Sequence, residues 1–158
     1  SREGGKRMPQ YRTAEEVKEI AEKLIDKYHK HLQQAGIYYL FRDPAPKSKG
    51  DVVFGRTSKV SGKYKAISGY DFIIEISQLH FMNMEEKKRI ALVDHELSHC
   101  KKEEDKYKTV SHDFEGFNTV LRRHGFWMGD LEIMGKTAKQ LELPFEENDK
   151  PNLQVVDG

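Results

Sequence analysis

Hydrophobic residues recur at helical spacing in the N-terminal part of the chain. Thr13 can cap a helix there, with Glu16 three positions further on. The apolar positions that follow share one face of such a helix: Val17, Ile20, Ala21, Leu24, Ile25 and Tyr28. This period predicts a long amphipathic helix that runs to about Gln34 and is stopped by Gly36.

The pattern changes to short extended segments between residues 37 and 77. The segment IYYLF (37–41) is rich in aromatic and branched residues, which favour strands, and the loop RDPAPKSKG ends it with two prolines and a glycine. Three further segments predict strands: DVVFGRTS (51–58), KYKAI (63–67) and DFIIEIS (71–77). The last is apolar enough to lie inside the sheet, so we expect a small sheet of three to four strands.

Helical periodicity returns after Met84. The apolar positions form a single stripe: Ile90, Val93, Leu97 and Cys100. This stripe predicts a helix that packs on the sheet. Two more helical segments are expected at residues 112–124 and 130–141, separated by GFWMG. An N-terminal helix, a sheet and later helices in separate runs predict an α+β fold.

Composition adds limits on the class of protein. A chain of 158 residues is expected to form one domain, which we place at residues 11–141, between a disordered tail at 1–10 and an acidic tail at 142–158. The formal net charge is only +1, which argues against strong direct binding to nucleic acid. One cysteine and no apolar run near the roughly 20 residues of a membrane span predict a cytoplasmic protein without a membrane partner.

The segment ALVDHELSHCKKEE (91–104) places two histidines four residues apart, with a glutamate directly after the first. On a helix, His95 and His99 lie about one turn apart, roughly 6 Å, so their imidazoles can bind one metal ion. Glu96 then lies beside the metal, close enough to take a proton from a bound water. Zinc in a catalytic site needs a third protein ligand and leaves a fourth position for water.

Three downstream residues compete for the third position. His112 lies 13 residues past His99 (112 − 99), after a polar connection long enough to reverse the chain. Glu115 on the same predicted helix is its main rival. Asp105 stands where some compact metalloproteases carry a ligand after a glycine turn, but Lys102 occupies the turn position here. We therefore predict His112 as the ligand, with Glu115 and Asp105 as alternatives.

The segments GYDFIIEIS, ALVDHELSHC and HDFEGFNTVLRRHGFW resemble the putative phage metallopeptidase family, small single-domain proteins of bacteriophages and prophages. The resemblance covers about residues 52–127. More distantly, HELSHC followed by a later histidine resembles the SprT-like and Spartan proteases, although the chain lacks the Cys-rich zinc ribbon of many SprT-like proteins. The resemblance implies a zincin-like domain that hydrolyses protein or peptide substrates with zinc. The implied site consists of His95, His99 and His112 as ligands and Glu96 as general base.

A second motif, QLELPF, looks like the short peptides with which bacterial DNA polymerases and their regulators bind the sliding clamp. The residues that would contact the clamp are Gln140, Leu141, Leu143, Pro144 and Phe145. Leu143 and Phe145 would enter an apolar pocket, while Gln140 would form a hydrogen bond at its rim. Alternatively, the three apolar side chains of the motif cover the domain core where the last helix ends.

Two classes of function follow from these motifs. The first is a zinc-dependent metallopeptidase of phage or prophage origin, which clamp binding would bring to DNA-associated proteins. The second is a non-catalytic, clamp-associated or host-targeting interaction protein in which the metal only stabilises the fold. The fourth coordination position separates them, because a structural zinc site closes it with protein and a catalytic site leaves it to water.

Overall fold

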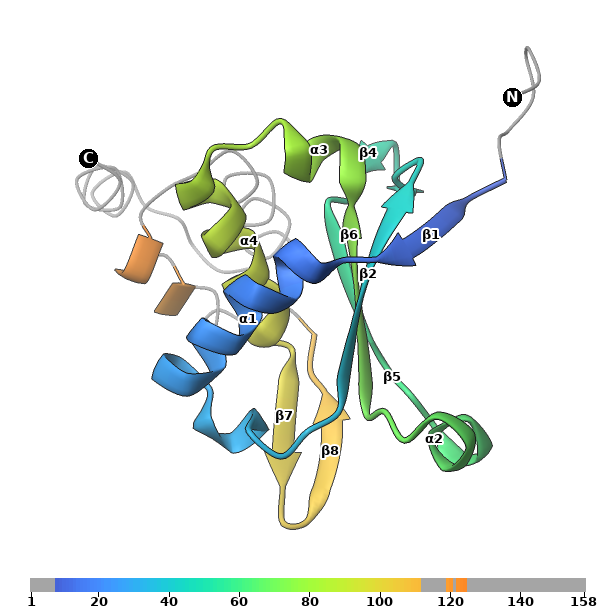
Figure 1. Cartoon of the computed structure of the whole chain (residues 1–158), viewed down its shortest axis with the longest axis vertical. Helices are drawn as coiled ribbons and strands as arrows, with labels where there is room; N and C mark the ends of the chain where they lie inside the picture. The colour runs from blue at the N-terminus through green and yellow to red at the C-terminus, as the bar shows by residue number, and fades with distance from the viewer. Residues whose placement is uncertain (1–7, 112–118, 121, 125–158) are drawn as a thin grey trace.

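The computed structural model describes residues 8–111, 119–120 and 122–124 (Figure 1). The elements in chain order are β1 (Gln10–Thr13), α1 (Glu15–Tyr28), the 3-10 helix η1 (Lys30–Leu32), β2 (Ile37–Asp43), β3 (Lys47–Ser48), β4 (Asp51–Val52), β5 (Gly55–Lys59), α2 (Gly62–Ser68), β6 (Phe72–Ser77), α3 (Gln78–Met82), α4 (Glu86–Leu97), β7 (Cys100–Glu103) and β8 (Lys106–Thr109). The described residues of 119–124 are helical. This mixture of helices and sheets confirms the α+β class. Among the described residues, every helix is too short or too polar to span a membrane.

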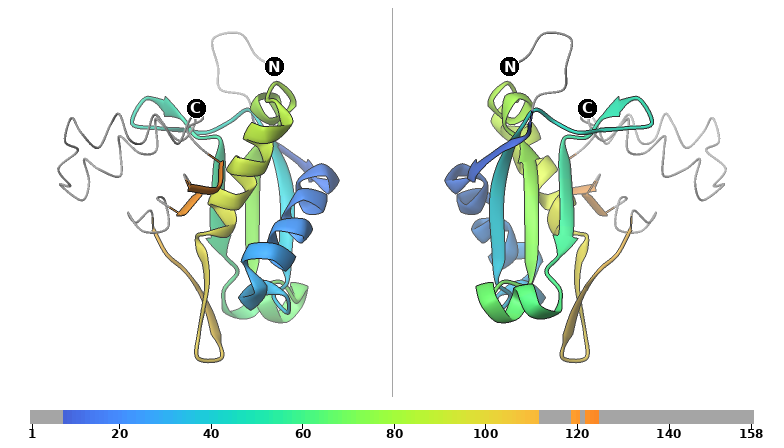
Figure 2. Two further views of the ribbon diagram at one scale, coloured as in Figure 1. Left: turned by 90° about the vertical axis from the view of Figure 1, so that its left-hand side faces the viewer. Right: turned by 90° about the vertical axis from the view of Figure 1, so that its right-hand side faces the viewer.

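The main sheet has four strands in the order β1-β2-β6-β5. β2 and β6 run parallel, with Ile37 opposite Phe72, while β1 and β5 pair antiparallel to their neighbours. β6 therefore lies inside the sheet, as its nearly continuous apolar sequence predicted. Helices α1 and α4 lie against one face of this sheet (Figure 2). Two small hairpins, β3-β4 and β7-β8, lie outside it.

The core lies between this sheet face and the two helices. Its largest fully buried side chains are Phe41, Phe72, Phe81, Leu32, Ile74, Ile76, Leu92, Leu97, Val17, Val93 and Val120. Phe41 of β2 and Phe81 of α3 pack with their ring centroids 5.3 Å apart. Alternate residues of β2 and β6 enter the core, which fixes their register because a shift by one residue would expose them. The C-terminal end of α4 is thereby held against the sheet.

The first helix differs from its prediction at both ends. It ends at Tyr28 and not near Gln34, because His29 leaves helical geometry and its ring forms a buried hydrogen bond of 2.6 Å to Asp94. Thr13 is not the helix cap. It is the last residue of β1, and its hydroxyl forms a hydrogen bond with the hydroxyl of Tyr38. The strand β1 also begins at Gln10, inside the segment expected to be a tail.

The segment KYKAI does not form the predicted strand but lies within helix α2. Two glycines with positive φ frame this helix: Gly62 at 43° and Gly69 at 80°. The N–H of Gly69 donates to the carbonyl of Lys65 over 2.7 Å, which closes the last turn. No residue of α2 is buried, so its apolar residues carry no packing signal from which the helix could be predicted.

Candidate metal centre

The helix that carries the HExxH sequence is shorter than predicted. It ends at Leu97 with Ser98 as its C-cap, and Cys100 already begins β7. His95 and Glu96 lie in the last turn of α4, whereas His99 lies just beyond it. The N–H of His99 still donates to the carbonyl of Glu96 over 3.1 Å, which keeps the tight turn. The second histidine is therefore held by both the helix end and the hairpin that follows.

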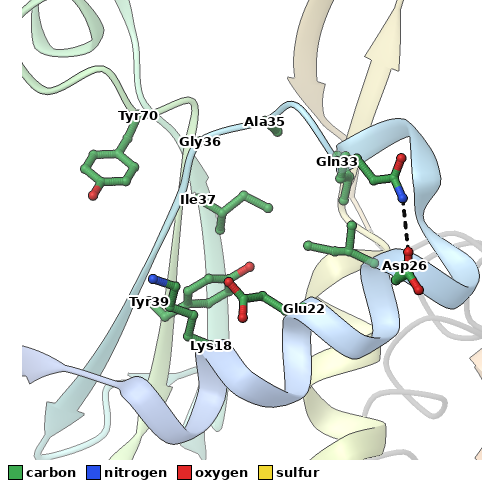
Figure 3. Close-up of a pocket in the computed structure, with 11 residues that line it drawn as sticks. Lys18, Glu22, Asp26, Gln33, Ala35, Gly36, Ile37, Tyr39 and Tyr70 are labelled. Atoms are coloured by element: carbon green, nitrogen blue, oxygen red, sulfur yellow. Dashed lines mark hydrogen bonds between the residues drawn. The ribbon is translucent and has the colours of Figure 1, made fainter.

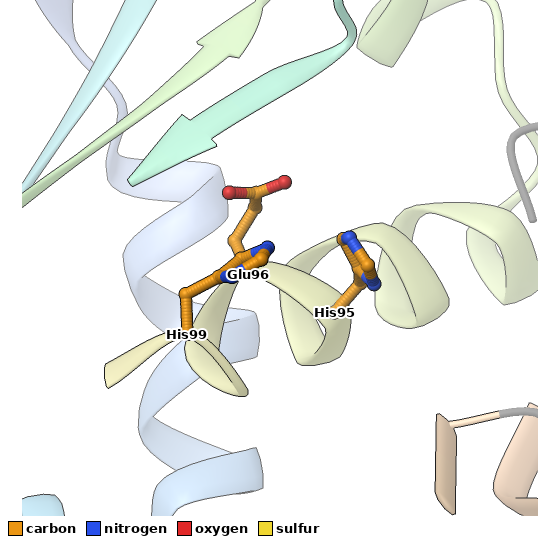
Figure 4. A group of neighbouring side chains, drawn as sticks. All are labelled: His95, Glu96 and His99. Atoms are coloured by element: carbon orange, nitrogen blue, oxygen red, sulfur yellow. The ribbon is translucent and has the colours of Figure 1, made fainter. Parts of the chain in front are cut away.

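His95, Glu96 and His99 form one cluster in which the possible ligand atoms all lie within 4.8 Å of one another. Figure 4 shows the three side chains on the same side of the helix end. The two imidazole centroids are 5.0 Å apart and their planes stand at 88°. His95 is only 2% exposed and Glu96 only 3%. Two imidazoles and a carboxylate are a donor set that suits zinc and similar divalent metals.

The backbone of Val110 orients the ring of His99. Its carbonyl oxygen lies 2.6 Å from Nδ1 of His99, and its N–H donates to the carbonyl of His99 over 2.9 Å. A carbonyl only accepts, so Nδ1 carries the proton and Nε2 carries the lone pair that can bind a metal. Metal-binding histidines usually have such a partner on the second nitrogen. The observed geometry therefore fits a metal ligand.

Glu96 is buried against strand β5. The hydroxyl of Thr57 donates to Oε1 of Glu96 over 2.7 Å and lies 3.1 Å from its carbonyl oxygen. Burial raises the pKa of the Glu96 carboxyl above its usual range, while the neighbouring His99 and the Thr57 hydroxyl oppose the rise. A raised carboxyl pKa is a common property of groups that accept and return a proton in catalysis.

Directly before the cluster, Asp94 is a fully buried carboxylate with three cationic or polar partners. His29 lies 2.6 Å away through Nε2, His124 lies 2.8 Å away through Nε2, and Arg123 contacts both carboxylate oxygens at 2.8 and 2.7 Å. Burial favours a higher pKa, but the hydrogen bonds from His124, His29 and Arg123 outweigh it and hold the pKa of Asp94 well below its usual range. Asp94 is therefore ionised at neutral pH.

The histidines outside the motif also have defined partners in the structure. His29 is buried, and Nε2 of His31 donates a hydrogen bond to the carbonyl of Cys100 over 3.1 Å. Cys100 itself lies fully buried in the core, as predicted, and burial raises the pKa of its thiol. His124 serves as a partner of Asp94, a role that its sequence position does not indicate.

The structure does not bring every predicted ligand to the cluster. Asp105 lies in the turn of the β7-β8 hairpin, beyond the Glu103–Lys106 pair, which is three register steps and about 10 Å from the Cys100–Thr109 pair. It therefore cannot serve as the third ligand in this conformation, because residues 100–109 form a hairpin and not the expected helix end and loop. His112, Glu115 and the motif at 140–145 lie outside the described residues.

A separate pocket of about 400 Å³ lies between α1 and the start of β2 (Figure 3). Lys18, Glu22 and Tyr39 are among the residues that line it, and none of its lining residues belongs to the metal cluster. The pocket lies on β2, whereas the cluster lies against β5, and β6 separates these strands. The pocket and the His-Glu-His cluster are therefore separate.

No curated protein and no solved structure matches the chain. The model of a family described as "Putative phage metallopeptidase" matches residues 9–142, which is most of the chain. The matched range contains the His-Glu-His cluster, the hairpin that orients His99 and the buried Asp94 with its partners. A metallopeptidase family implies a bound metal and protein or peptide substrates, and the cluster provides suitable ligands for the metal. The chain belongs to this putative phage metallopeptidase family.

Proposed function

We propose that the protein is a zinc-dependent peptidase of the HExxH type, of phage or prophage origin, in which His95 and His99 bind zinc and Glu96 is the general base. The observation that carries the proposal is the cluster of their ligand atoms within 4.8 Å, on a chain of a metallopeptidase family. The hydrogen bond from His99 to the Val110 carbonyl supports it, because it leaves Nε2 as the metal-binding nitrogen.

The proposed mechanism uses Glu96 as a proton carrier. Zinc held by His95 and His99 would polarise the scissile carbonyl and would lower the pKa of the attacking water. Glu96 takes the proton from this water and later gives it to the leaving amine. Glu96 is only 3% exposed, and this burial raises the pKa of its carboxyl above the usual range. The hydrogen bond from Thr57 holds one oxygen of the Glu96 carboxylate.

His112 is the proposed third ligand, with Glu115 as the alternative. The chain is tied to the segment 94–99 on both sides of these residues: Val110 bonds to His99, and Arg123 bonds to Asp94. His112 is two residues past Val110, so at most about 7 Å of chain separates their Cα atoms. This connection supports a ligand from the segment that follows β8, in the arrangement that SprT-like proteases use.

The proposed substrate is a protein or peptide bound in extended form along β5. This strand is an edge of the main sheet, since it pairs with β6 alone among the described strands. An extended peptide can add to such an edge through backbone hydrogen bonds. Thr57 of β5 contacts Glu96 directly, so a peptide on this edge would run beside the proposed base.

The second candidate function is a non-catalytic interaction protein with a structural metal, and the observation that favours it is the QLELPF motif. Clamp binding through residues 140–145 is also compatible with the peptidase, because it would bring the enzyme to proteins on DNA without a DNA-binding domain. Either role assumes that the protein acts in the cytoplasm of a bacterial host. The two candidates differ in whether Glu96 performs chemistry.

The test compares the zinc-loaded wild type with Glu96→Gln on a fluorescent casein substrate. Gln keeps the size of the side chain but removes the base, so the cleavage rate should fall by roughly 100-fold or more. Zinc content, measured by atomic emission, should not change. Glu22→Gln removes an exposed carboxylate of α1 and should cleave like the wild type. Equal rates for Glu96→Gln and the wild type would refute the general-base assignment. A wild type that binds zinc through four protein ligands and cleaves nothing would favour the interaction protein.

A further inference from the structure

Strand β5 approaches the Glu96 carboxylate at two positions, Gly55 and Thr57. Residues two apart on a strand face the same side of the sheet, so both positions face α4. The hydroxyl of Thr57 donates to Oε1 over 2.7 Å. A Cβ built on Gly55 would lie 2.8 Å from Oε2 and 3.0 Å from both Cγ and Cδ of Glu96. One oxygen is therefore held by a hydrogen bond, and the rest of the carboxylate occupies the space that a larger residue at position 55 would need.

From this geometry we infer that Thr57 and Gly55 are positioning residues that fix the orientation of the Glu96 carboxylate beside the metal centre. The inference rests on the proposed role of Glu96 as general base. A glutamate side chain has three rotatable bonds, and burial alone does not select one orientation of its carboxylate. The Thr57 hydroxyl selects one, and the backbone of Gly55 permits it. Both residues approach Glu96 itself, so we expect them to act on the base and not on metal affinity.

The orientation of a general base has a large effect on rate. A displacement of about 1 Å in an active site can lower the rate by roughly 100-fold, and a hydrogen bond to a charged group corresponds to about a tenfold change or more. A residue that only stabilises the strand would instead reduce the amount of folded protein. Loss of a positioning residue should therefore lower kcat per folded, metal-loaded molecule, whereas loss of a residue that only stabilises the strand should not.

The activity test uses substitutions at Thr57 in the full chain. Thr57→Val keeps the shape of the side chain and removes the hydroxyl, whereas Thr57→Ser keeps the hydroxyl and removes the methyl group. We expect kcat of Thr57→Val on fluorescent casein to fall by about tenfold or more, with KM and zinc content within about twofold of the wild type. Thr57→Ser should retain most of kcat. Thr13→Val makes the same chemical change on β1, at the opposite edge of the sheet, and is the matched control that should match the wild type.

Gly55→Ala tests the second contact and replaces Thr57→Val if that variant does not fold. The added methyl group would force the Glu96 carboxylate to move, so kcat should again fall by about tenfold or more while zinc content stays unchanged. A wild-type kcat for the folded Thr57→Val or Gly55→Ala variant would overturn the inference for that residue. Such a result with Glu96→Gln inactive would leave the proposed function intact. An active Glu96→Gln would instead refute the proposed function.

A thermal-unfolding cycle on the metal-free protein provides a readout that does not need activity. It combines Thr57→Val with Glu96→Ala, because the contribution of a hydrogen bond disappears when either partner is already absent. We expect Thr57→Val to lower the melting temperature clearly in the wild type and by less than half as much in the Glu96→Ala background. The same decrease in both backgrounds would show that Thr57 does not hold the Glu96 carboxylate and would overturn the inference.

Discussion

One guanidinium nitrogen of Arg123 donates hydrogen bonds to both carboxylate oxygens of Asp94, over 2.8 and 2.7 Å, and Asp94 is fully buried. Asp94 directly precedes the proposed zinc ligand His95, so this ion pair ties the helical residues 122–124 to the C-terminal end of α4. His29 brings α1 to the same carboxylate. A buried charge is stable only when its partners are all present, so Asp94 makes the positions of these three segments depend on one another.

The first prediction concerns this buried carboxylate. Asp94→Asn should lower the free energy of unfolding by about 3 kcal/mol, because it removes the negative charge that the buried or half-buried partners require. Chemical denaturation measures the change. Asp26→Asn on the exposed face of α1 is the control and should change the free energy by less than about 0.5 kcal/mol. Equal effects of the two substitutions would contradict a special role of Asp94 in the fold.

The sequence was sufficient for those elements whose burial follows a regular period. The apolar run at 71–77 predicted an interior strand, and β6 occupies that position. Regular alternation was absent from the segment that became α2, where all side chains are exposed and two glycines set the ends. The hairpin β7-β8 was not predicted, because Cys100 fits the apolar stripe of the preceding helix. In the structure Cys100 is buried, but it is the first residue of strand β7.

The candidate site was only partly predictable for a different reason. The spacing of His95 and His99 reflects local geometry, and the structure places them together as expected. The three partners of Asp94 come from 65, 29 and 30 residues away, and no local pattern encodes such pairs. The partner of His99 is a backbone carbonyl, which every residue has. Gly55 leaves space for the Glu96 carboxylate because it has no side chain. This role can be seen only in the structure, where Glu96 lies beside it.

A second prediction concerns the third zinc ligand. His112→Ala should lower the zinc content after dialysis sharply, because two protein ligands hold zinc much more weakly than three. Asp105→Ala should keep full zinc content, since Asp105 lies at the far end of the hairpin. Atomic emission on the dialysed proteins measures both. Full occupancy in His112→Ala together with a loss in Glu115→Ala would transfer the role to Glu115.

A third prediction tests the packing of the interior strand. Ile76→Ala should lower the free energy of unfolding by about 2–5 kcal/mol, because the side chain is fully buried in the core and its removal leaves a cavity. Ile67→Ala makes the same chemical change on α2, where the side chain is 81% exposed, and should cost less than about 0.5 kcal/mol. Denaturant titration of both variants checks the comparison. Similar losses would mean that β6 is not in the centre of the core.

The last prediction is that residues 140–145 dock on a bacterial sliding clamp. Near-neutral net charge gives the domain little means of binding DNA itself, so a linear motif would explain how a peptidase reaches DNA-associated proteins. A motif of this length buries little surface, and we expect micromolar affinity, about −8 kcal/mol, by calorimetry with purified clamp. Replacing Leu143 and Phe145 with Ala should abolish binding and leave the melting temperature unchanged, because the two side chains would enter the clamp pocket and not the domain core. If the double substitution instead lowers the melting temperature by several degrees, these residues belong to the core. The docking prediction would then be wrong, but the proposed metal centre would not be affected, because His95, Glu96 and His99 lie outside the motif.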